Sequence, residues 1–213
     1  MIDEHTQRRR SSFWKELPIL LGVAILVAIL VRTFVLQTFY IPSPSMEHTL
    51  NIDDRVLVYK LVYDFRSPHR GEIIVFEAPA DWRTGPEGED FIKRVIGVGG
   101  DRVVCCDPQN RLVINGQSLD EPYIYTNEGG IQDAPAKEPF DITVPAGRLW
   151  VMGDHRAASG DSLEHYSGGD VNDATISEDA VIGRAFAIFW PVGRATWLTV
   201  PKPFDKIPDP APK

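Results

Sequence analysis

An uncharged and almost wholly apolar run, from Leu17 to Val31, sets the first limit on what this chain can fold into. Its 15 residues are short for a helix that crosses a bilayer, which needs about 20. Continuing through Arg32 to Leu36 supplies the missing length, because a long arginine side chain can extend to the lipid headgroups. We therefore predict a transmembrane anchor over residues 16–36, preceded by a tail over residues 1–15.

The basic residues around this run are unevenly distributed. Four of them precede it: Arg8, Arg9, Arg10 and Lys15. After Arg32, no Lys or Arg occurs before Arg55. Because Lys and Arg are enriched on the cytoplasmic side of an anchor, we expect a single-pass protein of the cell membrane with its N-terminus in the cytoplasm. Everything after the anchor would then lie outside the cytoplasm.

A cleaved signal peptide is the alternative, since a basic start followed by an apolar core also fits one. Cleavage needs small residues shortly after the core. Here the core is followed by RTFVLQTFY, residues 32–40, which contains no Ala-x-Ala-like site. The sequence therefore favours an uncleaved anchor.

The chain beyond residue 36 has the composition of short strands separated by turns. Gly and Pro contribute 17 residues each, which suits many turns and few helices. The strand-like segments are DRVLVYKLVYDF, GEIIVFEAP, DFIKRVIGVGGD, RVVCC, RLVING, DITVPAG, RLWVMGD and AVIGRAFAIFWPV. We predict a mainly β fold, with a β-rich extracytoplasmic domain over residues 37–200 whose strands pair non-locally. The continuous apolar run in GEIIVFEAP predicts a strand that is buried on both faces.

Two further segments are predicted to lie outside the strands. TNEGGIQDAPAKEPFD, residues 126–141, is polar and acidic and is interpreted as a surface loop. The last residues, 201–213, form a Pro-rich tail that we expect to be extended.

Composition also limits the partners of the chain. Its net charge of −8 argues against a nucleic-acid partner, because phosphate binding needs a basic face. The two cysteines, Cys105 and Cys106, are adjacent and form no disulfide framework, so we interpret them as small packing residues on opposite faces of a strand. We found no glycine-rich phosphate loop and no paired-cysteine metal spacing, and we expect no metal or organic cofactor.

Chemistry is suggested by the segment YIPSPSMEHTL, residues 40–50, where Ser43 and Ser45 are framed by prolines. A serine is a poor nucleophile unless a neighbouring base activates it and donors stabilise the oxyanion. His48 follows closely but has no evident orienting partner. His155, beside Asp154, is the stronger histidine candidate for a base of the Ser-His-Asp kind.

A lysine is the other kind of base, and Lys93 is the candidate among the lysines beyond the anchor. Alternation along FIKRVIG gives Lys93 the apolar neighbours Phe91 and Val95 on its own face. Such surroundings lower the pKa of an ammonium from its usual value of about 10.4. Arg94 has equally apolar neighbours, but a guanidinium does not lose its proton in proteins. If either residue is a base, it is Lys93; otherwise Lys93 is a lysine at the edge of a strand.

The segment MGDHRAASGDS, residues 152–162, has the Gly, Asp and Ser content of a turn cluster. It could also supply hydroxyl groups and a carboxylate that orient a catalytic lysine. A metal site formed by Asp154, His155 and His165 is conceivable, but the three residues have no recognised ligand spacing.

In their order along the chain these segments resemble bacterial type I signal peptidases, which are membrane-bound serine proteases with a Ser-Lys dyad. The anchor is followed by IPSPSMEHTL, then by DDRVLVYK, by RGEIIVFEAP with FIKRVIGVGGD, and by MGDHRAASGDS. The resemblance covers residues 32–162, with weaker support from IFWPVGR near the end. Four segments in the right order are far more specific than any one of them.

The resemblance implies a role for five residues. Ser45 corresponds to the nucleophile and Lys93 to the general base. Ser43 corresponds to the serine whose hydroxyl joins the Ser45 backbone N–H in the oxyanion hole. Ser159 corresponds to a serine that hydrogen-bonds the lysine, and Asp161 corresponds to a carboxylate that supports the site.

The sequence departs from the family pattern at four positions. Pro44 stands where the family commonly has Gly between the serines, which biases Ser43 towards an extended conformation. His48 and Gly99 stand where the family has Pro. Leu163 follows the Asp-Ser pair where Arg is common, so an ion pair made by that Arg is absent or supplied elsewhere. None of these changes removes a catalytic group.

The implied function is a membrane-anchored endopeptidase that removes signal peptides from exported preproteins at the outer face of the cytoplasmic membrane. Its partners would be those signal peptides, with small residues at positions −1 and −3, and the membrane lipid. Three alternatives remain open: a Ser-His-Asp hydrolase using Ser45 and His155, a dyad protease with one dedicated substrate or its own chain as substrate, and a non-catalytic single-pass protein whose β-domain binds a partner.

Overall fold

The structure, a computed structural model, describes residues 4–83, 88–166 and 169–210. The outermost parts of the two predicted tails, residues 1–3 and 211–213, lie outside the described residues. The chain divides into two compact units, Met1–Gln37 and Thr38–Lys213. The finer limits given above for the tails, the anchor and the β-rich domain stay predictions.

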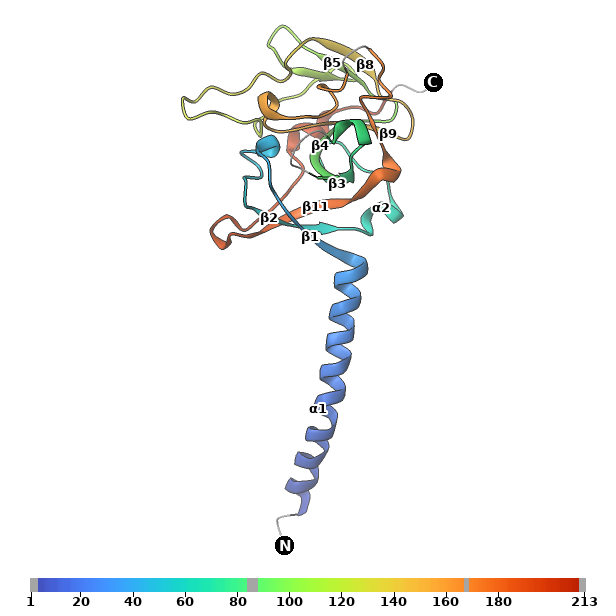
Figure 1. The fold of residues 1–213 in the computed structure, drawn as a ribbon, viewed down its shortest axis with the longest axis vertical. Helices are drawn as coiled ribbons and strands as arrows, with labels where there is room; N and C mark the ends of the chain where they lie inside the picture. The colour runs from blue at the N-terminus through green and yellow to red at the C-terminus, as the bar shows by residue number, and fades with distance from the viewer. Residues whose placement is uncertain (1–3, 84–87, 167–168, 211–213) are drawn as a thin grey trace. The chain divides into compact units, whose positions relative to one another are not determined.

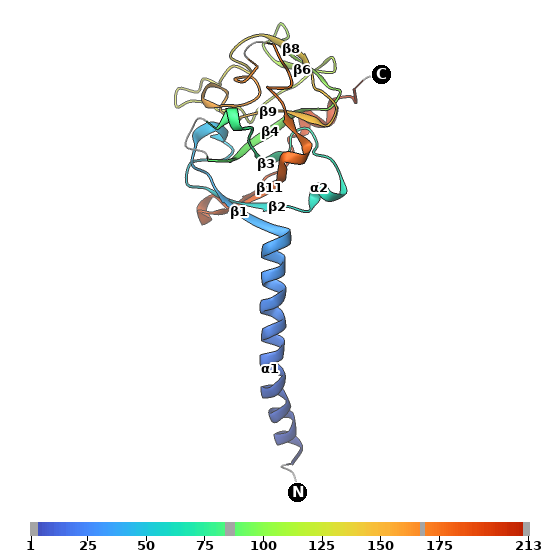
Figure 2. The same cartoon turned by 45° about the vertical axis from the view of Figure 1, so that its right-hand side comes forward.

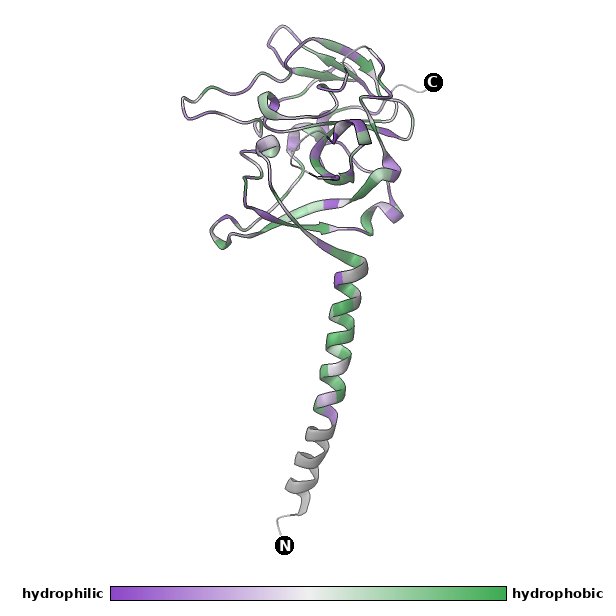
Figure 3. Ribbon diagram, in the orientation of Figure 1, coloured by the Kyte–Doolittle hydropathy of each residue, from purple (hydrophilic) through white to green (hydrophobic). Residues whose placement is uncertain are grey.

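The first unit is helical. Helix α1 (Glu4–Leu30) is followed by the π-helical turn η1 (Val31–Val35), and strand β1 (Leu36–Tyr40) starts at the last residue of the predicted anchor (Figure 1). Hydrophobic residues follow one another along the part of α1 whose side chains are described (Figure 3). Among the residues searched, none of the helices combines the length and the apolar character needed to cross a membrane. The anchor therefore stays a prediction.

The second unit is built mainly from strands, which confirms the mainly β part of the predicted fold. Its longer strands are β2 (Arg55–Tyr59), β3 (Ile73–Glu77), β4 (Asp90–Val98), β5 (Arg102–Cys105), β6 (Leu112–Ile114), β8 (Phe140–Thr143), β9 (Arg148–Met152) and β11 (Val181–Trp190). Two-residue strands are β7 (Gln117–Ser118), β10 (Ile176–Ser177) and β12 (Thr196–Trp197). The helical turns are η2 (Pro44–Met46), α2 (Val62–Phe65), η3 (Ala80–Trp82), η4 (Arg156–Ala158), η5 (Glu178–Ala180), η6 (Val192–Arg194) and η7 (Lys202–Lys206). Each longer strand overlaps one of the strand-like segments of the sequence. Strand β8 begins one residue before DITVPAG, at the buried Phe140, so the last two residues of the predicted surface loop over 126–141 belong to this strand.

The strands form two sheets. The first has the order β1-β2-β11-β3-β4-β9-β10, with β12 paired to β11, and the second has the order β7-β6-β5-β8 (Figures 1 and 2). From β2 onward the paired strands are antiparallel. Strand β11 lies between β2 and β3 although more than a hundred residues separate it from them in sequence, so the expected non-local pairing is confirmed. Strand β4 lies inside the first sheet, between β3 and β9.

Burial explains why the inner strands hold their places. Four of the five residues of β3 are buried, as its continuous apolar sequence predicts. The segment before β2 is anchored by Ile41, Met46 and Leu50, each at most 1% exposed and packed against apolar residues of β2, β3 and β11. Packing of this density leaves little freedom to the two serines between Ile41 and Met46.

Two expectations from the sequence are wrong. The final segment is not simply extended, because Lys202–Lys206 forms a 3₁₀ turn and both Phe204 and Ile207 are buried in the core. Cys105 and Cys106 are not separate packing residues on opposite faces: β5 ends at Cys105, and the two sulfur atoms form a disulfide between neighbours. Neither feature has a periodic pattern from which it could be predicted.

Candidate active site

The two serines lie on the short turn η2. Ser43 is the N-cap and is extended, with φ −126° and ψ 158°, as a residue before proline tends to be. Pro44 occupies the first helical position, where its missing N–H does not interrupt a hydrogen bond. The Ser43 hydroxyl lies 3.2 Å from the Ser45 hydroxyl, and the side chains are 8% and 2% exposed. The turn therefore holds two buried hydroxyl groups side by side.

Lys93 reaches these hydroxyl groups from strand β4. Its Nζ lies 2.8 Å from Ser45 Oγ, which is within the range for proton transfer between the two atoms. Lys93 is fully buried, and its Nζ lies 5.2 Å from the centre of the Phe91 ring on the same face of the strand. A serine and a lysine 48 residues apart in sequence are thus brought into direct contact in the protein interior.

Arg94 contacts a different set of groups. Its Nε and Nη2 donate to the two oxygens of Asp154 at 2.8 and 2.6 Å, and its Nη1 donates to the Gly71 carbonyl at 2.9 Å. The guanidinium also lies 4.1 Å from the centre of the Tyr123 ring. Burial alone would lower the pKa of Arg94, but the charge and hydrogen bonds of Asp154 outweigh it and raise that pKa. Arg94 therefore keeps its positive charge, and the Asp154 carboxylate neutralises that charge.

Asp154 connects this ion pair to the serine segment. Its Oδ2 accepts a hydrogen bond from Thr49 Oγ1 at 2.5 Å, and the carboxylate is fully buried. No local pattern in the sequence marks Asp154 or Thr49 for this role. The sign of an ion pair in the sequence was Arg94 itself, because an arginine between apolar residues of a buried strand needs an acidic partner.

The segment that follows β9 lies against the serine turn η2. A side chain on Gly153 would collide with the Ser45 carbonyl oxygen and with Ser159. Asp161 holds this glycine in place, because its carboxylate accepts from the backbone N–H of Gly153 at 2.9 Å and from that of Leu163 at 3.1 Å. Two backbone amides thus bind the Asp161 carboxylate. One of them belongs to Leu163, the residue that stands where the family commonly has arginine.

Ser159 lies beside Gly153 and is 4% exposed. Its Oγ has no hydrogen-bond partner among the described residues. The hydrogen bond to Lys93 that the resemblance implies is therefore not made in this structure, and its role stays a prediction.

His48 and His155 lie near the serine turn but do not contact the Ser45 hydroxyl. The partners of that hydroxyl are Ser43 and Lys93. His48 Nδ1 lies 3.2 Å from the Ile124 carbonyl oxygen. His155 directs its ring towards Glu47, with Nδ1 3.2 Å from Oε2. This arrangement favours the lysine over a histidine as the base.

The conceivable metal site combined Asp154 and His155 with His165. His165 stacks on the Trp82 ring at 4.3 Å, and its Nδ1 lies 2.9 Å from the Asp161 carbonyl oxygen. Within the part of the chain that the structure describes, no three His, Cys, Asp or Glu side chains could hold a metal ion together.

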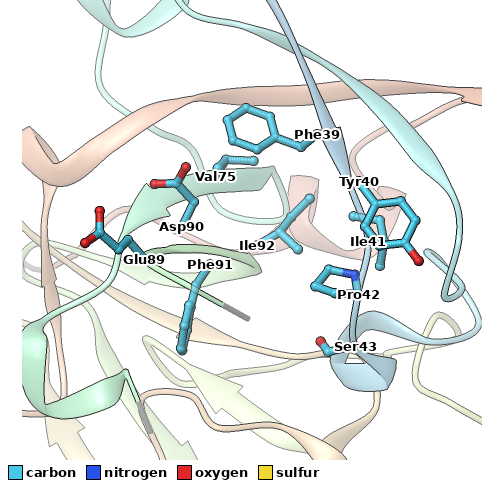
Figure 4. A pocket seen from close by; sticks show the side chains of 10 residues that line it. All are labelled: Phe39, Tyr40, Ile41, Pro42, Ser43, Val75, Glu89, Asp90, Phe91 and Ile92. Atoms are coloured by element: carbon cyan, nitrogen blue, oxygen red, sulfur yellow. The ribbon is translucent and has the colours of Figure 1, made fainter. Parts of the chain in front are cut away.

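A cavity of about 200 Å³ adjoins Ser43 (Figure 4). Its apolar lining comes from Phe39, Ile41, Pro42, Val75, Phe91 and Ile92. Glu89 and Asp90 lie at the side away from Ser43. Partial burial and then the nearby carboxylates of Glu89 and Glu77 raise the pKa of Asp90. The cavity can receive an apolar side chain next to the two hydroxyl groups.

Comparisons with known proteins agree with this geometry. The family model described as "Signal peptidase, peptidase S26" matches residues 14–190. A probable signal peptidase I of Mycobacterium leprae is 36% identical, over 88% of this chain and 79% of its own length. A probable signal peptidase I-2 of Synechocystis is 42% identical, over 87% and 78%. A crystal structure of a signal peptidase I from Enterococcus faecalis matches 56% of this chain and 97% of its own at 27% identity, with a TM-score of 0.41, and the family assignment does not depend on it.

Proposed function

The chain belongs to the signal peptidase family, peptidase S26, and on this basis we propose that it is a membrane-anchored serine endopeptidase that cleaves signal peptides from exported preproteins. Ser45 is the proposed nucleophile and Lys93 the general base. The contact of 2.8 Å between Lys93 Nζ and Ser45 Oγ is the observation that carries this proposal. Two groups of the right chemistry, both at most 2% exposed, meet there with no water-filled space between them.

In the proposed reaction, neutral Lys93 takes the proton from Ser45 Oγ as the oxygen attacks the scissile carbonyl. Burial supports the neutral form of a lysine, because it disfavours the ammonium. The leaving amine receives the proton, and an ester between Ser45 and the signal peptide remains. Lys93 then takes a proton from water as the water oxygen attacks the ester, and it returns this proton to Ser45 Oγ when the ester bond breaks and the signal peptide leaves with a free carboxyl group.

The negative oxygen of each tetrahedral intermediate is held by the Ser45 backbone N–H and the Ser43 hydroxyl in this proposal. The distance of 3.2 Å between the two hydroxyl oxygens supports a role for Ser43, since a carbonyl attacked by Ser45 must lie next to both. Asp161 acts indirectly by holding Gly153 against the Ser45 carbonyl, and Ser159 flanks the same glycine.

The substrate preference follows from the space beside Ser43. The family resemblance implies small residues at positions −1 and −3 of the substrate. A cavity of only about 200 Å³ whose walls next to Ser43 are apolar supports such a preference, because a polar side chain would lose hydration against those walls.

We also propose that residues 16–36 form the membrane anchor, with the N-terminus in the cytoplasm and the peptidase domain outside. Eight apolar side chains of α1 support this, each more than half exposed: Ile19, Leu20, Leu21, Val23, Ile25, Leu26, Val27 and Ile29. Apolar residues exposed on all sides of a helix suit a lipid environment. The membrane lipid would be the second partner, beside the preprotein.

Cleavage of a preprotein in detergent by the wild type, Ser45→Ala and Lys93→Ala tests the dyad. Both variants should lose cleavage by about 1,000-fold or more while keeping their circular dichroism. Lys202→Ala, which removes an exposed lysine, serves as the matched control and should cleave as the wild type does. Cleavage by Lys93→Ala at the wild-type rate would disprove the proposed base.

The same assay separates the alternatives. A Ser-His-Asp hydrolase would lose cleavage completely in His155→Ala, whereas a dyad enzyme keeps measurable cleavage. A protease with one dedicated substrate would fail on a panel of unrelated preproteins. A non-catalytic binding protein would process no preprotein, and Ser45→Ala would leave its function intact.

A further inference from the structure

His155 contacts the nucleophile turn at two points. Its backbone N–H donates to the Ser45 carbonyl oxygen at 3.1 Å. Its Nδ1 lies 3.2 Å from Oε2 of Glu47, the residue that ends the turn η2, in a close polar contact that lacks the geometry of a hydrogen bond. The main chain and the side chain of one residue thus meet the turn on both sides of Met46, so a shift of His155 changes the position of Ser45.

The imidazole is itself held from the opposite side. It stacks on the Tyr125 ring, with 3.9 Å between the ring centres and 21° between the planes. Its Nε2 lies 3.9 Å from Asp133 Oδ2, which also accepts from the Ala157 N–H at 2.9 Å. The His155 side chain is only 16% exposed. The ring therefore lies between the serine turn and the surface loop that follows Tyr125.

Main-chain hydrogen bonds fix the loop on which the ring rests. The Tyr125 N–H donates to the Asp154 carbonyl oxygen and the Asp133 N–H donates to the Tyr125 carbonyl oxygen, each at 2.9 Å. The carboxylates that face the imidazole are those of Glu47 and Asp133, whereas the neighbouring Asp154 carboxylate is bound by Arg94. The ring has a rigid support on one side and the turn with the nucleophile on the other.

We propose that His155 is a positioning residue for cleavage: through Glu47 it holds the Ser45 turn at the distance from Lys93 that proton transfer needs. The inference rests on the proposed function. Displacing a reacting group by 1 Å can slow a reaction about 100-fold, so loss of one of several contacts to the turn should have a smaller effect. Neither His155 nor Glu47 lines the cavity beside Ser43, so substrate binding should not change.

A double-mutant cycle on preprotein cleavage tests the proposal. kcat and KM are measured for the wild type, His155→Gln, Glu47→Gln and the double variant, with thermal midpoints recorded for each. Each single variant should lower kcat about 5-fold with KM unchanged. The double variant should also lose only about 5-fold, because both substitutions remove the same contact. His69→Gln, the same substitution at an exposed histidine, is the matched control and should keep the wild-type kcat.

Several results would overturn the proposal. An unchanged kcat in either single variant would do so, as would a double variant whose loss is the product of the two single losses. A rise in KM with kcat unchanged would assign these residues to substrate binding instead. If His155→Gln does not fold, Glu47→Gln decides alone, because the Glu47 carboxylate is 36% exposed and its replacement leaves the core intact. Cleavage by Lys93→Ala in the same assay would show that the dyad has failed, not the positioning contact.

Discussion

Two buried basic residues, Lys93 and Arg94, occupy adjacent positions of β4, and the contacts described for them differ. On one side, Lys93 meets the Ser45 hydroxyl and the face of Phe91. On the other side, Arg94 has a bidentate carboxylate, a carbonyl oxygen and an aromatic ring. Both oxygens of the Asp154 carboxylate accept from Arg94, so this ion pair joins strand β4 to the segment that follows β9. Lys93 lies in direct contact with the Ser45 hydroxyl, and this is the geometry that the proposed proton transfer needs.

Replacing Lys93 by arginine tests this contrast most strongly. Lys93→Arg keeps a long basic side chain but removes the capacity to act as a base, because the guanidinium stays protonated. kcat for preprotein cleavage should fall by about 10,000-fold. Single-turnover cleavage with excess enzyme gives the residual rate, and circular dichroism checks the fold. If Lys93→Arg cleaves at a rate within tenfold of the wild type, Lys93 does not act as a base, and it no longer differs from Arg94 in function.

Replacing Arg94 tests the structural side. Arg94→Met leaves the Asp154 carboxylate buried without its cation, so the free energy of unfolding should fall by about 4 kcal/mol. Urea titration measures this loss. Adding Asp154→Leu to the same chain should recover part of it, since an apolar pair needs no partner. Unchanged stability in Arg94→Met would show that the ion pair does not hold the two segments together.

Removing the Ser43 hydroxyl should affect the reaction but not binding. Ser43→Ala should lower kcat about 100-fold with KM unchanged, because one donor to the oxyanion is lost. Steady-state kinetics on a signal-peptide substrate measure both constants. Ser67→Ala, at an exposed serine, is the control and should behave as the wild type. A loss below fivefold would mean that the Ser45 backbone N–H suffices.

The smallest expected effect concerns Glu72, whose main-chain carbonyl accepts from Val95 of β4. Burial raises the pKa of Glu72, but hydrogen bonds from Arg66 and the His69 N–H and the charge of Arg184 outweigh it and lower the pKa below its usual 4.5. The stabilisation is therefore present above about pH 4.5 and is lost as the pH falls through the lower, folded-state pKa. Urea titrations across this range should show a weaker pH dependence in Glu72→Gln.

Glu138→Gln, which changes an exposed carboxylate, is the control for that titration and should keep the wild-type dependence on pH. An identical slope in Glu72→Gln and the wild type would mean that the ion pairs of Glu72 do not stabilise the folded state.

Residues with a local signal could be predicted from the sequence. The β-rich fold follows from apolar, β-branched segments between turn residues. The framing prolines mark Ser43 and Ser45 alike, and charge among apolar residues marks Lys93 and Arg94 alike. The roles of Ser45 as nucleophile and Lys93 as base are implied by the family resemblance. Their contact is now described, whereas their roles in catalysis stay predictions.

Features that depend on distant partners could not be predicted. Arg94 and Asp154 are 60 residues apart, and neither segment indicates the other. The burial of Phe204 was missed because a Pro-rich segment carries no strand or helix periodicity, although an aromatic residue within it was a usable sign. Bonding between Cys105 and Cys106 depends on the backbone at the end of β5, which spacing does not reveal.

Pro44 has a consequence for when the serine turn becomes ordered. A proline at the first position of η2 restricts the backbone even in the unfolded chain, and Met46 and Leu50 complete the restriction once the core forms. The entropy lost in arranging the two hydroxyl groups therefore belongs to folding, which happens once per molecule. Each later substrate meets a turn that is already ordered, and its binding free energy remains available for the reaction itself.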